Sequence, residues 1–478
     1  MDFNSLDKTI RKLMRKRNTP GMAIGIIKDG ETVYSKGFGC RNLKQQLPMD
    51  SDTLIGIGSI TKSFTAFAII KLQELGKLTI EDSAADYLDY EPFKSRPEIK
   101  IKHMLSHSSG VPSLDAGMLS FSYTFDDFSR VYPASTMQDF MAHMGDADDF
   151  ILFEPGEKFF YNNDMYTCLG FIVEKVSGIS FVDFVQQQIL DPLAMNRAVL
   201  TKASFDNDPD NNVMTGYLFD VKNGKAVAKE SEHPMDGYLH APGGIYASMN
   251  DMLHYAQCLL DNGEYKGAQL LSAESVGQLF TGQITTPYGE GDSPEYALGW
   301  TVEEKSEAMP YVVVQHGGGM GTSNSLLILV PELKLAICAA ENAGTGITPV
   351  ICRAAIAIAL GQEPEEAIED LRIGNALDEI EGTYKSAYNM YSLAITRKGG
   401  VLQADVETDD GSFSFPLIPS DIDKLEFSTY SLKANSKAKV VFYRNKDSQK
   451  VEFAAYDRFL YRREWLLNLF FSHDGVIF

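Results

Sequence analysis

The chain has 478 residues, of which 44% are hydrophobic and 23% charged, a composition that excludes a fibrous or disordered protein and allows two globular domains. Its formal net charge of −22 argues against nucleic acid and anionic membrane surfaces as partners. No apolar run reaches the roughly 20 residues of a membrane-spanning helix, and the polar N-terminus lacks the apolar core of a secretory signal, so we expect a cytoplasmic protein.

The first elements expected after an N-terminal helix are a hairpin and a buried helix. Residues 21–39 contain two β-rich runs that meet at Asp29 and Gly30, a pair that favours a tight turn. Residues 59–78 are apolar around most of a helix circumference, and the helix is expected to stop at Gly76. A helix of this kind belongs in the interior of a large domain.

Helical patterns and strand-like runs alternate in the following part of the chain. Helices are expected at 165–176, 181–190 and 248–261, and strands at 311–316 and 325–342. Strands come from both ends of this part and helices fill its middle. We therefore expect an α+β domain over residues 1–365 whose sheet joins distant segments.

The last quarter of the sequence has a different pattern. Residues 366–378 are acidic and polar, which is typical of a linker. Short alternating strands follow, so residues 379–478 predict a small all-β domain, an antiparallel barrel or sandwich. The apolar end, residues 465–478, is expected to form either a closing strand or a subunit contact.

The cysteines give no sign of a disulfide framework. They are odd in number, lack CxxC spacing and mostly have apolar neighbours, so we expect free thiols in a reducing compartment. Zinc binding or thiol catalysis is the alternative. The residues are Cys40, Cys168, Cys258, Cys338 and Cys352.

Ser59 and Lys62 form a Ser-x-x-Lys motif at the start of the apolar helix. Residues three apart share a helix face, and burial lowers the pKa of a lysine, so Lys62 could take the proton of Ser59 and make it a nucleophile. The Ser59 backbone N–H would be among the free donors at the helix start, where it can hold an oxyanion. The spacing alone is not specific, because it also occurs at 5–8 and 436–439 in polar surroundings.

Two further motifs follow in order along the chain. Tyr161 and Asn163 form Tyr-x-Asn just before an expected helix, and His316 and Gly318 form His-x-Gly at the end of an expected strand. Each motif recurs elsewhere in the sequence. The ordered set in its buried context is therefore the informative feature.

With these motifs the sequence resembles the penicillin-binding-protein-like serine hydrolases, which include class C β-lactamases, D-Ala-D-Ala carboxypeptidases, D-aminopeptidases and esterases. The resemblance covers about residues 5–360, with further support from MLSHSSGVP at 104–112, DPLAMNRA at 191–198, APGGIYASMNDM at 241–252 and YALGW at 296–300. It implies a β-lactamase/transpeptidase-like domain, with an antiparallel sheet and a helical subdomain. Strand-rich appendages of related peptidases resemble lipocalin-like barrels, which implies that residues 379–478 either assemble a homo-oligomer or restrict access to the site.

The resemblance also implies a role for each motif residue. Ser59 would be the acylated nucleophile and Lys62 its base or proton shuttle. Tyr161 would be a second proton-relay group, serving the leaving group or the deacylating water, and Asn163 would orient Lys62 and the substrate amide. Whether Lys62 or Tyr161 is the acylation base stays open, as it does for the family.

The glycine-rich strand end is expected to bind the substrate backbone. The N–H groups of Ser59 and Gly319 would form the oxyanion hole, and Gly317 and Gly318 would let the strand approach the substrate. His316 stands where many family members have lysine, so a group that titrates near neutrality would replace a permanent cation. Carboxylate-bearing substrates, including β-lactams, are therefore less favoured than peptides with a free amino end or neutral esters.

We expect a serine hydrolase that forms an acyl-enzyme on Ser59 and cleaves small peptides, D-residue-containing peptides included, without a metal or other cofactor. The alternatives are a carboxylesterase or β-lactamase-type hydrolase on the same site, and a non-catalytic peptide-binding module. His103 and His107 lie four apart but lack the glutamate of His-Glu-x-x-His, so we interpret them as structural. Residues 118–137 would either overhang the site or form an ordinary surface subdomain.

Overall fold

The computed structural model describes residues 3–464 apart from 114–121, 123, 126–128, 130–135, 223–224, 236, 288–292, 308, 399–400, 409–410, 432–435 and 457. The chain divides into two compact units, Met1–Gly361 and Gln362–Phe478. Each unit has its own sheet and its own hydrophobic core. None of the described helices combines the length and the apolar character needed to cross a membrane.

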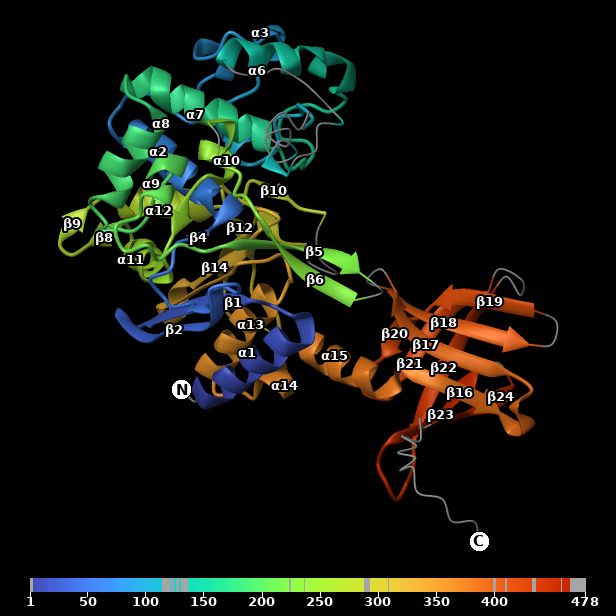
Figure 1. Ribbon diagram of the computed structural model, residues 1–478. Coiled ribbons are helices and arrows are strands. Elements are labelled where there is room, and N and C mark those ends of the chain that lie inside the picture. The colour runs from blue at the N-terminus through green and yellow to red at the C-terminus, as the bar shows by residue number, and fades with distance from the viewer. Residues whose placement is uncertain are drawn as a thin grey trace. The chain divides into compact units, whose positions relative to one another are not determined.

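A nine-stranded antiparallel sheet lies at the centre of the first unit (Figure 1). Its order is β10-β11-β12-β13-β14-β15-β1-β2-β3, so the first strand of the chain pairs with one more than 300 residues later, Met22 opposite Glu341. Asp29 and Gly30 join the first two strands with φ of 53° and 82°, as the tight turn requires. The strands are β1 (Gly21–Lys28), β2 (Glu31–Asn42), β3 (Leu47–Pro48), β10 (Ile284–Thr285), β11 (Glu295–Tyr296), β12 (Thr301–Glu303), β13 (Val313–Gly319), β14 (Asn324–Val330) and β15 (Leu335–Glu341).

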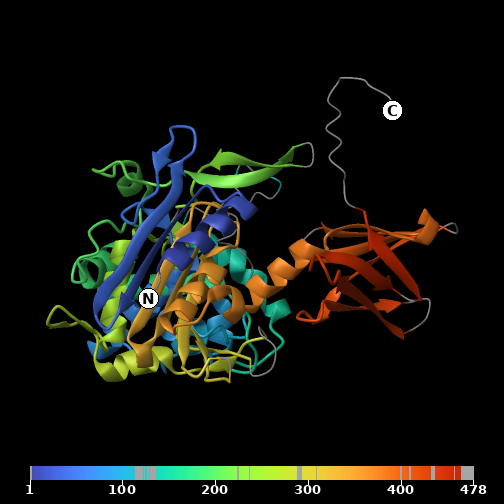
Figure 2. The ribbon, with the colours of Figure 1, turned by 90° about the horizontal axis from the view of Figure 1, so that it is seen from below.

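Helices cover both faces of this sheet (Figures 1 and 2). α1 (Phe3–Arg17) and α13 (Thr348–Ala359) pack together on one face, while α11 (Met249–Leu260) packs against β1 and β15 on the other. The further helices of this unit are α2 (Thr61–Glu74), α3 (Glu91–Ser95), α4 (Ile101–Leu105), α6 (Met137–His143), α7 (Asn163–Ser177), α8 (Phe181–Val185), α9 (Lys202–Asp206), α10 (His240–Gly243) and α12 (Ala273–Phe280). Short strand pairs join β4 (Ile55–Gly56) to β7 (Tyr246–Ala247), β5 (Gly216–Lys222) to β6 (Lys225–Ser231) and β8 (Glu264–Tyr265) to β9 (Ala268–Gln269).

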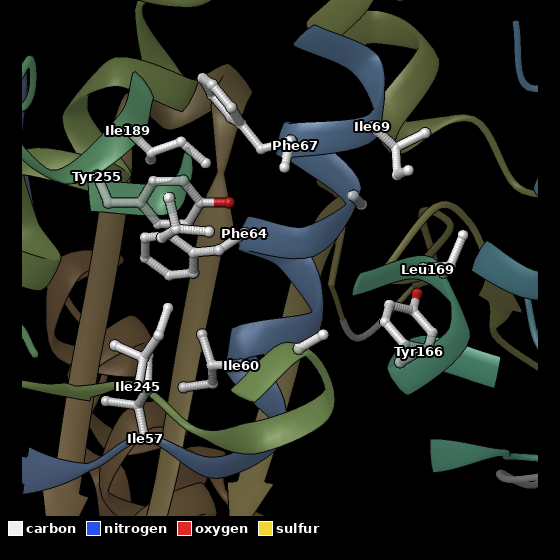
Figure 3. Close-up of a cluster of buried hydrophobic side chains, with 14 of the residues drawn as sticks. Ile57, Ile60, Phe64, Phe67, Ile69, Tyr166, Leu169, Ile189, Ile245 and Tyr255 are labelled. Carbon is white, nitrogen blue, oxygen red and sulfur yellow. The ribbon is translucent and has the colours of Figure 1, made fainter. Parts of the chain in front are cut away.

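The helix α2 lies inside the helical layer, as its apolar circumference predicts. Phe64 stacks on Tyr255 of α11 with ring centroids 3.9 Å apart, and Phe67 and Ile60 pack into the same cluster (Figure 3). A 3-10 turn, η1 (Gly58–Ile60), precedes the helix, and Gly76 follows its end with φ of 67°. Burial of this cluster fixes where the first turn of α2 lies.

In its described residues the second unit begins with two helices, α14 (Pro364–Ala367) and α15 (Glu369–Ile380), and continues as strands with one 3-10 turn at Ala387–Asn389. Its antiparallel sheet has the order β19-β18-β17-β16-β24-β23-β22-β21-β20, and β19 also approaches β21, so the sheet is a nearly closed barrel. Leu393 and Val406 belong to the buried set inside it. The strands are β16 (Gly382–Ser386), β17 (Ser392–Lys398), β18 (Val401–Thr408), β19 (Gly411–Pro416), β20 (Ile418–Asp421), β21 (Glu426–Ser431), β22 (Ser436–Arg444), β23 (Val451–Tyr456) and β24 (Phe459–Arg463).

The expected α+β domain followed by a barrel-like all-β domain is confirmed. Residues 366–378, expected as a linker, contain the end of α14 and most of α15. Ala376 and Ile380 of α15 join the core of the second unit, because their spacing of four places both on one helix face. Residues 465–478, expected as a strand or subunit contact, lie outside the described residues.

Candidate active site

Ser59 lies in the turn η1, two residues before α2 begins at Thr61, and the residue is partly exposed. Gly58 before it has φ of 50°, a left-handed conformation that strains any residue with a Cβ. This turn directs the chain from the two-stranded β4–β7 sheet into the buried helix. The serine is thus held between two rigid elements.

Lys62 is fully buried and its amine points at Ser59. Nζ lies 3.1 Å from Ser59 Oγ, 2.7 Å from Asn163 Oδ1 and 2.8 Å from the carbonyl oxygen of Pro242. Burial lowers the pKa of Lys62 well below 10.5, and the nearby Asp164 only partly opposes this effect. The amide and carbonyl oxygens can only accept, so Lys62 donates to both, and in its neutral form the amine would have its lone pair left for Ser59.

Asn163 reaches Lys62 from the first position of α7. The residue before it, Asn162, caps this helix by accepting the Met165 N–H at 3.1 Å. The same Asn162 side chain donates to the Val111 carbonyl at 3.0 Å. The start of α7 is therefore tied down on both sides of Asn163.

Tyr161 lies just before this cap, with the centre of its ring 4.8 Å from Lys62 Nζ. Tyr166 of α7 places its ring centre 5.4 Å from the same nitrogen. The structure thus brings together Ser59, Lys62, Tyr161 and Asn163, which are separated by up to about 100 residues in the sequence.

His316 lies on β13, and the expectation that it titrates near neutrality is wrong. Its Nε2 is 2.8 Å from the Tyr296 hydroxyl and its Nδ1 is 2.6 Å from the Gly317 carbonyl. Burial lowers the pKa of His316 to about 3, with a further contribution from Lys62. The carbonyl requires a proton on Nδ1, so Nε2 accepts from Tyr296 and the ring is neutral.

The glycines after His316 let β13 approach the turn that holds Ser59. A Cβ on Gly318 would lie 1.9 Å from the Ile57 carbonyl oxygen, and one on Gly58 would lie 2.7 Å from the Gly319 nitrogen. Ser325 of β14, which pairs with Gly318, donates to the same Ile57 carbonyl at 2.7 Å. The backbone of residues 58–59 therefore lies against the end of β13.

A cavity of about 450 Å³ opens beside Ser59 and is also lined by Asn163 and Gly319. Leu239, Met320 and Phe125 supply apolar walls, and none of the described lining residues is charged. Ser122 and Phe125 come from the segment 118–137, so two described residues of that segment lie at the site. Much of the segment lies outside the described residues.

Several residues at the site had not been identified from the sequence. The Pro242 carbonyl binds Lys62, and Tyr296 binds His316. Pro242 and Tyr296 lie in the segments APGGIYASMNDM and YALGW, whose resemblance to the family could have pointed to them. Ser325 and its neighbour Ser323, which donates to the Gly56 carbonyl at 2.8 Å, carried no signal.

The described residues contain no arrangement of side chains that fits the alternatives of zinc binding or thiol catalysis. No group of three or more His, Cys, Asp or Glu side chains there could hold a metal ion. His103 Nδ1 accepts the Lys100 N–H at 3.2 Å. His107 is buried, with its ring packed against the Tyr161 ring. The five cysteines are free, and burial raises the pKa of the Cys258 thiol to about 12.

Comparison with known proteins gives two family matches. Residues 6–359 match the Beta-lactamase family, and residues 364–462 match the Pab87 octamerisation domain. Penicillin-binding protein 4* of Bacillus subtilis (strain 168) is 26% identical over 341 residues, which cover 70% of this chain and 71% of that protein.

Solved structures show the same relationship. The octameric penicillin-binding protein homologue from Pyrococcus abyssi has a TM-score of 0.87 and 30% sequence identity, covering 96% of this chain and 100% of that chain. A D-stereospecific amidohydrolase from Streptomyces sp. has a similar fold, with a TM-score of 0.59, 21% identity, and coverage of 74% of this chain and 98% of that chain.

Proposed function

Because the chain belongs to the Beta-lactamase family of serine hydrolases, we propose that it hydrolyses amide bonds of small peptides, D-residue-containing peptides included, through an acyl-enzyme on Ser59. The observation that carries this proposal is the Lys62 amine, which is buried, 3.1 Å from Ser59 Oγ and held by two acceptor oxygens. A surface lysine at the same spacing would be a solvated cation and could not accept a proton from serine.

Acylation begins when Ser59 Oγ attacks the substrate carbonyl carbon and its proton passes to the Lys62 lone pair. The carbonyl oxygen becomes an oxyanion held by the N–H groups of Ser59 and Gly319. When the C–N bond breaks, the departing amine takes a proton from the Lys62–Tyr161 pair, and an ester on Ser59 remains. Asn163 keeps the Lys62 amine in place throughout.

Deacylation uses the same groups in reverse. A water molecule loses its proton to the Lys62–Tyr161 pair and attacks the ester, and the oxyanion forms again in the same place. When the C–O bond to Ser59 breaks, Oγ takes the proton back and the carboxylic acid leaves. No residue outside this group needs to change its charge.

The charges of the site support a substrate without a carboxylate beside the scissile bond. His316 is neutral because its pKa is about 3, and the described walls of the cavity carry no charge. A substrate carboxylate would lose its hydration here without gaining a counter-charge. Peptides with an uncharged residue at the cleaved bond are therefore favoured over β-lactams.

The proposal includes the organisation of the whole chain. We propose that residues 1–365 carry the catalytic domain, 366–378 connect it, and 379–478 form a barrel that assembles copies of a cytoplasmic homo-oligomer. The match of residues 364–462 to an octamerisation domain supports this part, as does the similarity to the octameric homologue from Pyrococcus abyssi.

The test is turnover of a matched substrate set: aminoacyl anilides of each chirality, a chromogenic ester of the same acyl group, and a β-lactam. We expect the anilides to be cleaved and the β-lactam to be the poorest substrate. An esterase would cleave the ester and neither anilide, which would favour the carboxylesterase alternative. Chelator treatment should leave every rate unchanged.

The nucleophile is tested by Ser59→Ala, with Ser436→Ala as the matched control. Ser436 begins another Ser-x-x-Lys spacing, at the exposed start of strand β22, where Lys439 binds Glu426. Ser59→Ala should abolish both turnover and the acyl adduct seen by intact mass, whereas Ser436→Ala should retain both. Equal turnover by wild type and Ser59→Ala would leave the non-catalytic binding module as the remaining interpretation.

A further inference from the structure

His107 is the second residue after α4 and is 1% exposed. Its φ is 57°, in the left-handed region that is unfavourable for a residue with a Cβ. A strained backbone of this kind persists only where the surrounding contacts hold it. The contacts of His107 therefore show what this conformation serves.

Two hydrogen bonds of His107 bracket Tyr161. The His107 carbonyl accepts the Phe160 N–H at 2.8 Å, and its Nδ1 accepts the Asn162 N–H at 3.0 Å. The ring of His107 also lies against the Tyr161 ring, with centroids 4.3 Å apart and planes tilted by 39°. One residue thus holds the chain before Tyr161, the chain after it and its ring.

Packing alone does not account for a histidine at this position. Because Nδ1 accepts a hydrogen bond, the ring proton is on Nε2, which is buried without a hydrogen-bond partner among the described residues. An apolar ring of similar size would fill the space without that unfavourable N–H. The acceptor at Nδ1 is the property that only a polar side chain supplies. Burial lowers the pKa of His107 well below 6.5, with Lys62 and His316 adding to the effect, and the neutral ring keeps this acceptor.

We propose that His107 is a positioning residue, which fixes the Tyr161 hydroxyl for proton transfer by holding residues 160 and 162 and the Tyr161 ring. It touches no reacting atom. The inference rests on the proposed role of Tyr161 in the serine hydrolase reaction.

The test compares His107→Gly with His107→Asn in the full-length protein. Glycine and asparagine both tolerate the left-handed backbone, but only asparagine offers an oxygen where Nδ1 stands. We expect His107→Gly to lower kcat by about 10- to 100-fold with KM nearly unchanged, since a displacement of a catalytic group by about 1 Å has effects of this size. His107→Asn should recover most of that loss.

The matched control is His103→Gly. His103 also accepts a backbone N–H with its Nδ1, from Lys100, but it does not bracket a site residue. We expect this variant to lower the unfolding temperature and to leave kcat within about twofold of wild type. A loss of kcat equal to that of His107→Gly would assign both histidines a general structural role and overturn the proposal.

A double-mutant cycle separates positioning of Tyr161 from any other effect. In a Tyr161→Phe background, His107→Gly should lower kcat by no more than about twofold, because coupled residues are non-additive. An undiminished effect in that background would contradict the proposal.

Crystal structures of the two variants give a readout that does not need turnover. We expect the Tyr161 ring to leave its position or to split into several conformers in His107→Gly, and to keep its position in His107→Asn. If wild type cleaves no substrate, the proposed function fails, and the Tyr161 position still decides this inference. An unmoved Tyr161 in both variants overturns it whatever the activity.

Discussion

At the scale of single residues, burial separates Ser59 and Lys62 from the other Ser-x-x-Lys spacings of the chain. Lys439, in the spacing at 436–439, is exposed and binds Glu426, so it is an ordinary surface cation. Lys62 has no exposed surface and three oxygen neighbours. The same two residue types at the same spacing therefore differ in chemistry because of what covers them.

This burial predicts the pH dependence of the reaction. In the proposed mechanism Lys62 accepts the Ser59 proton only while it is neutral, so kcat/KM should rise with pH as Lys62 loses its proton and then level off. The pKa of Lys62 is lowered well below 10.5, so the plateau should be reached well below that pH. The check is a kcat/KM profile from pH 4 to pH 10 with a neutral substrate. A rate that keeps rising up to pH 10 would contradict a depressed pKa.

Two variants test which residue causes kcat/KM to fall at low pH, the acid limb of the profile. Lys62→Arg places a permanent cation at the site and should lower kcat/KM by about 10²- to 10⁴-fold, the usual contribution of a general base. His316→Asn should leave the limb where it is, because the pKa of His316 is about 3 and its ring is neutral across this range. Disappearance of the limb in His316→Asn would instead assign it to the histidine.

Spacing predicted Ser59 and Lys62 as neighbours, and the family resemblance implied that Asn163 orients Lys62; the structure places all three in hydrogen-bond contact. The Pro242 carbonyl could not be predicted, because every residue has a carbonyl and the pair is 180 residues apart. The charge of His316 was mispredicted because the sequence does not show the depth of its burial or its contact with Tyr296.

At the scale of elements, the end of β13 is shaped by what lies against each of its glycines. Gly317 and Gly318 are adjacent, and both were expected to permit a close approach of the strand. A Cβ on Gly317 would have nothing nearer than 3.8 Å, whereas one on Gly318 would lie 1.9 Å from the Ile57 carbonyl oxygen. The close approach to the Ser59 turn thus depends on Gly318.

These two glycines give a matched pair of variants. Gly318→Ala pushes β13 away from Ile57, so it should destabilise the protein by about 1–3 kcal/mol, as overpacking does. It should also lower kcat by roughly 10²-fold, because the Gly319 N–H moves relative to Ser59. Gly317→Ala should change the free energy of unfolding by less than about 1 kcal/mol. Urea unfolding and kcat for both variants provide the check, and equal effects would show that the contact with Ile57 is not the cause.

Elements with a strong local pattern were predictable, and those shaped by tertiary contacts were not. The hairpin at Asp29–Gly30 and the helix ending before Gly76 follow from residues within a few positions. The strand expected at 311–316 is β13, which begins later, at Val313, and continues to Gly319, since β14 supplies partners for glycines that have little strand preference. Residues 366–378 are polar enough to resemble a linker, and their helices were not evident from composition.

At the scale of the whole molecule, the proposed catalytic residues and the barrel belong to different units of the chain. All the proposed catalytic residues lie in the unit Met1–Gly361, and its core, which includes Phe64 of α2 and Tyr255 of α11, is formed within that unit. The second unit has a separate core around Leu393 and Phe427. The order of strands in the first sheet closes that unit before residue 361, because β1 pairs with β15.

This separation predicts the outcome of removing the second unit. A chain that ends at Gly361 should be smaller in its assembled state than the full-length protein, measured by light scattering after gel filtration. It should still be acylated on Ser59 by a small activated ester, measured by intact mass, because the Lys62 contacts lie entirely within the unit that remains. An unchanged number of subunits would show that the first unit assembles by itself. A folded chain that no longer forms the adduct would show that the barrel contributes to the site.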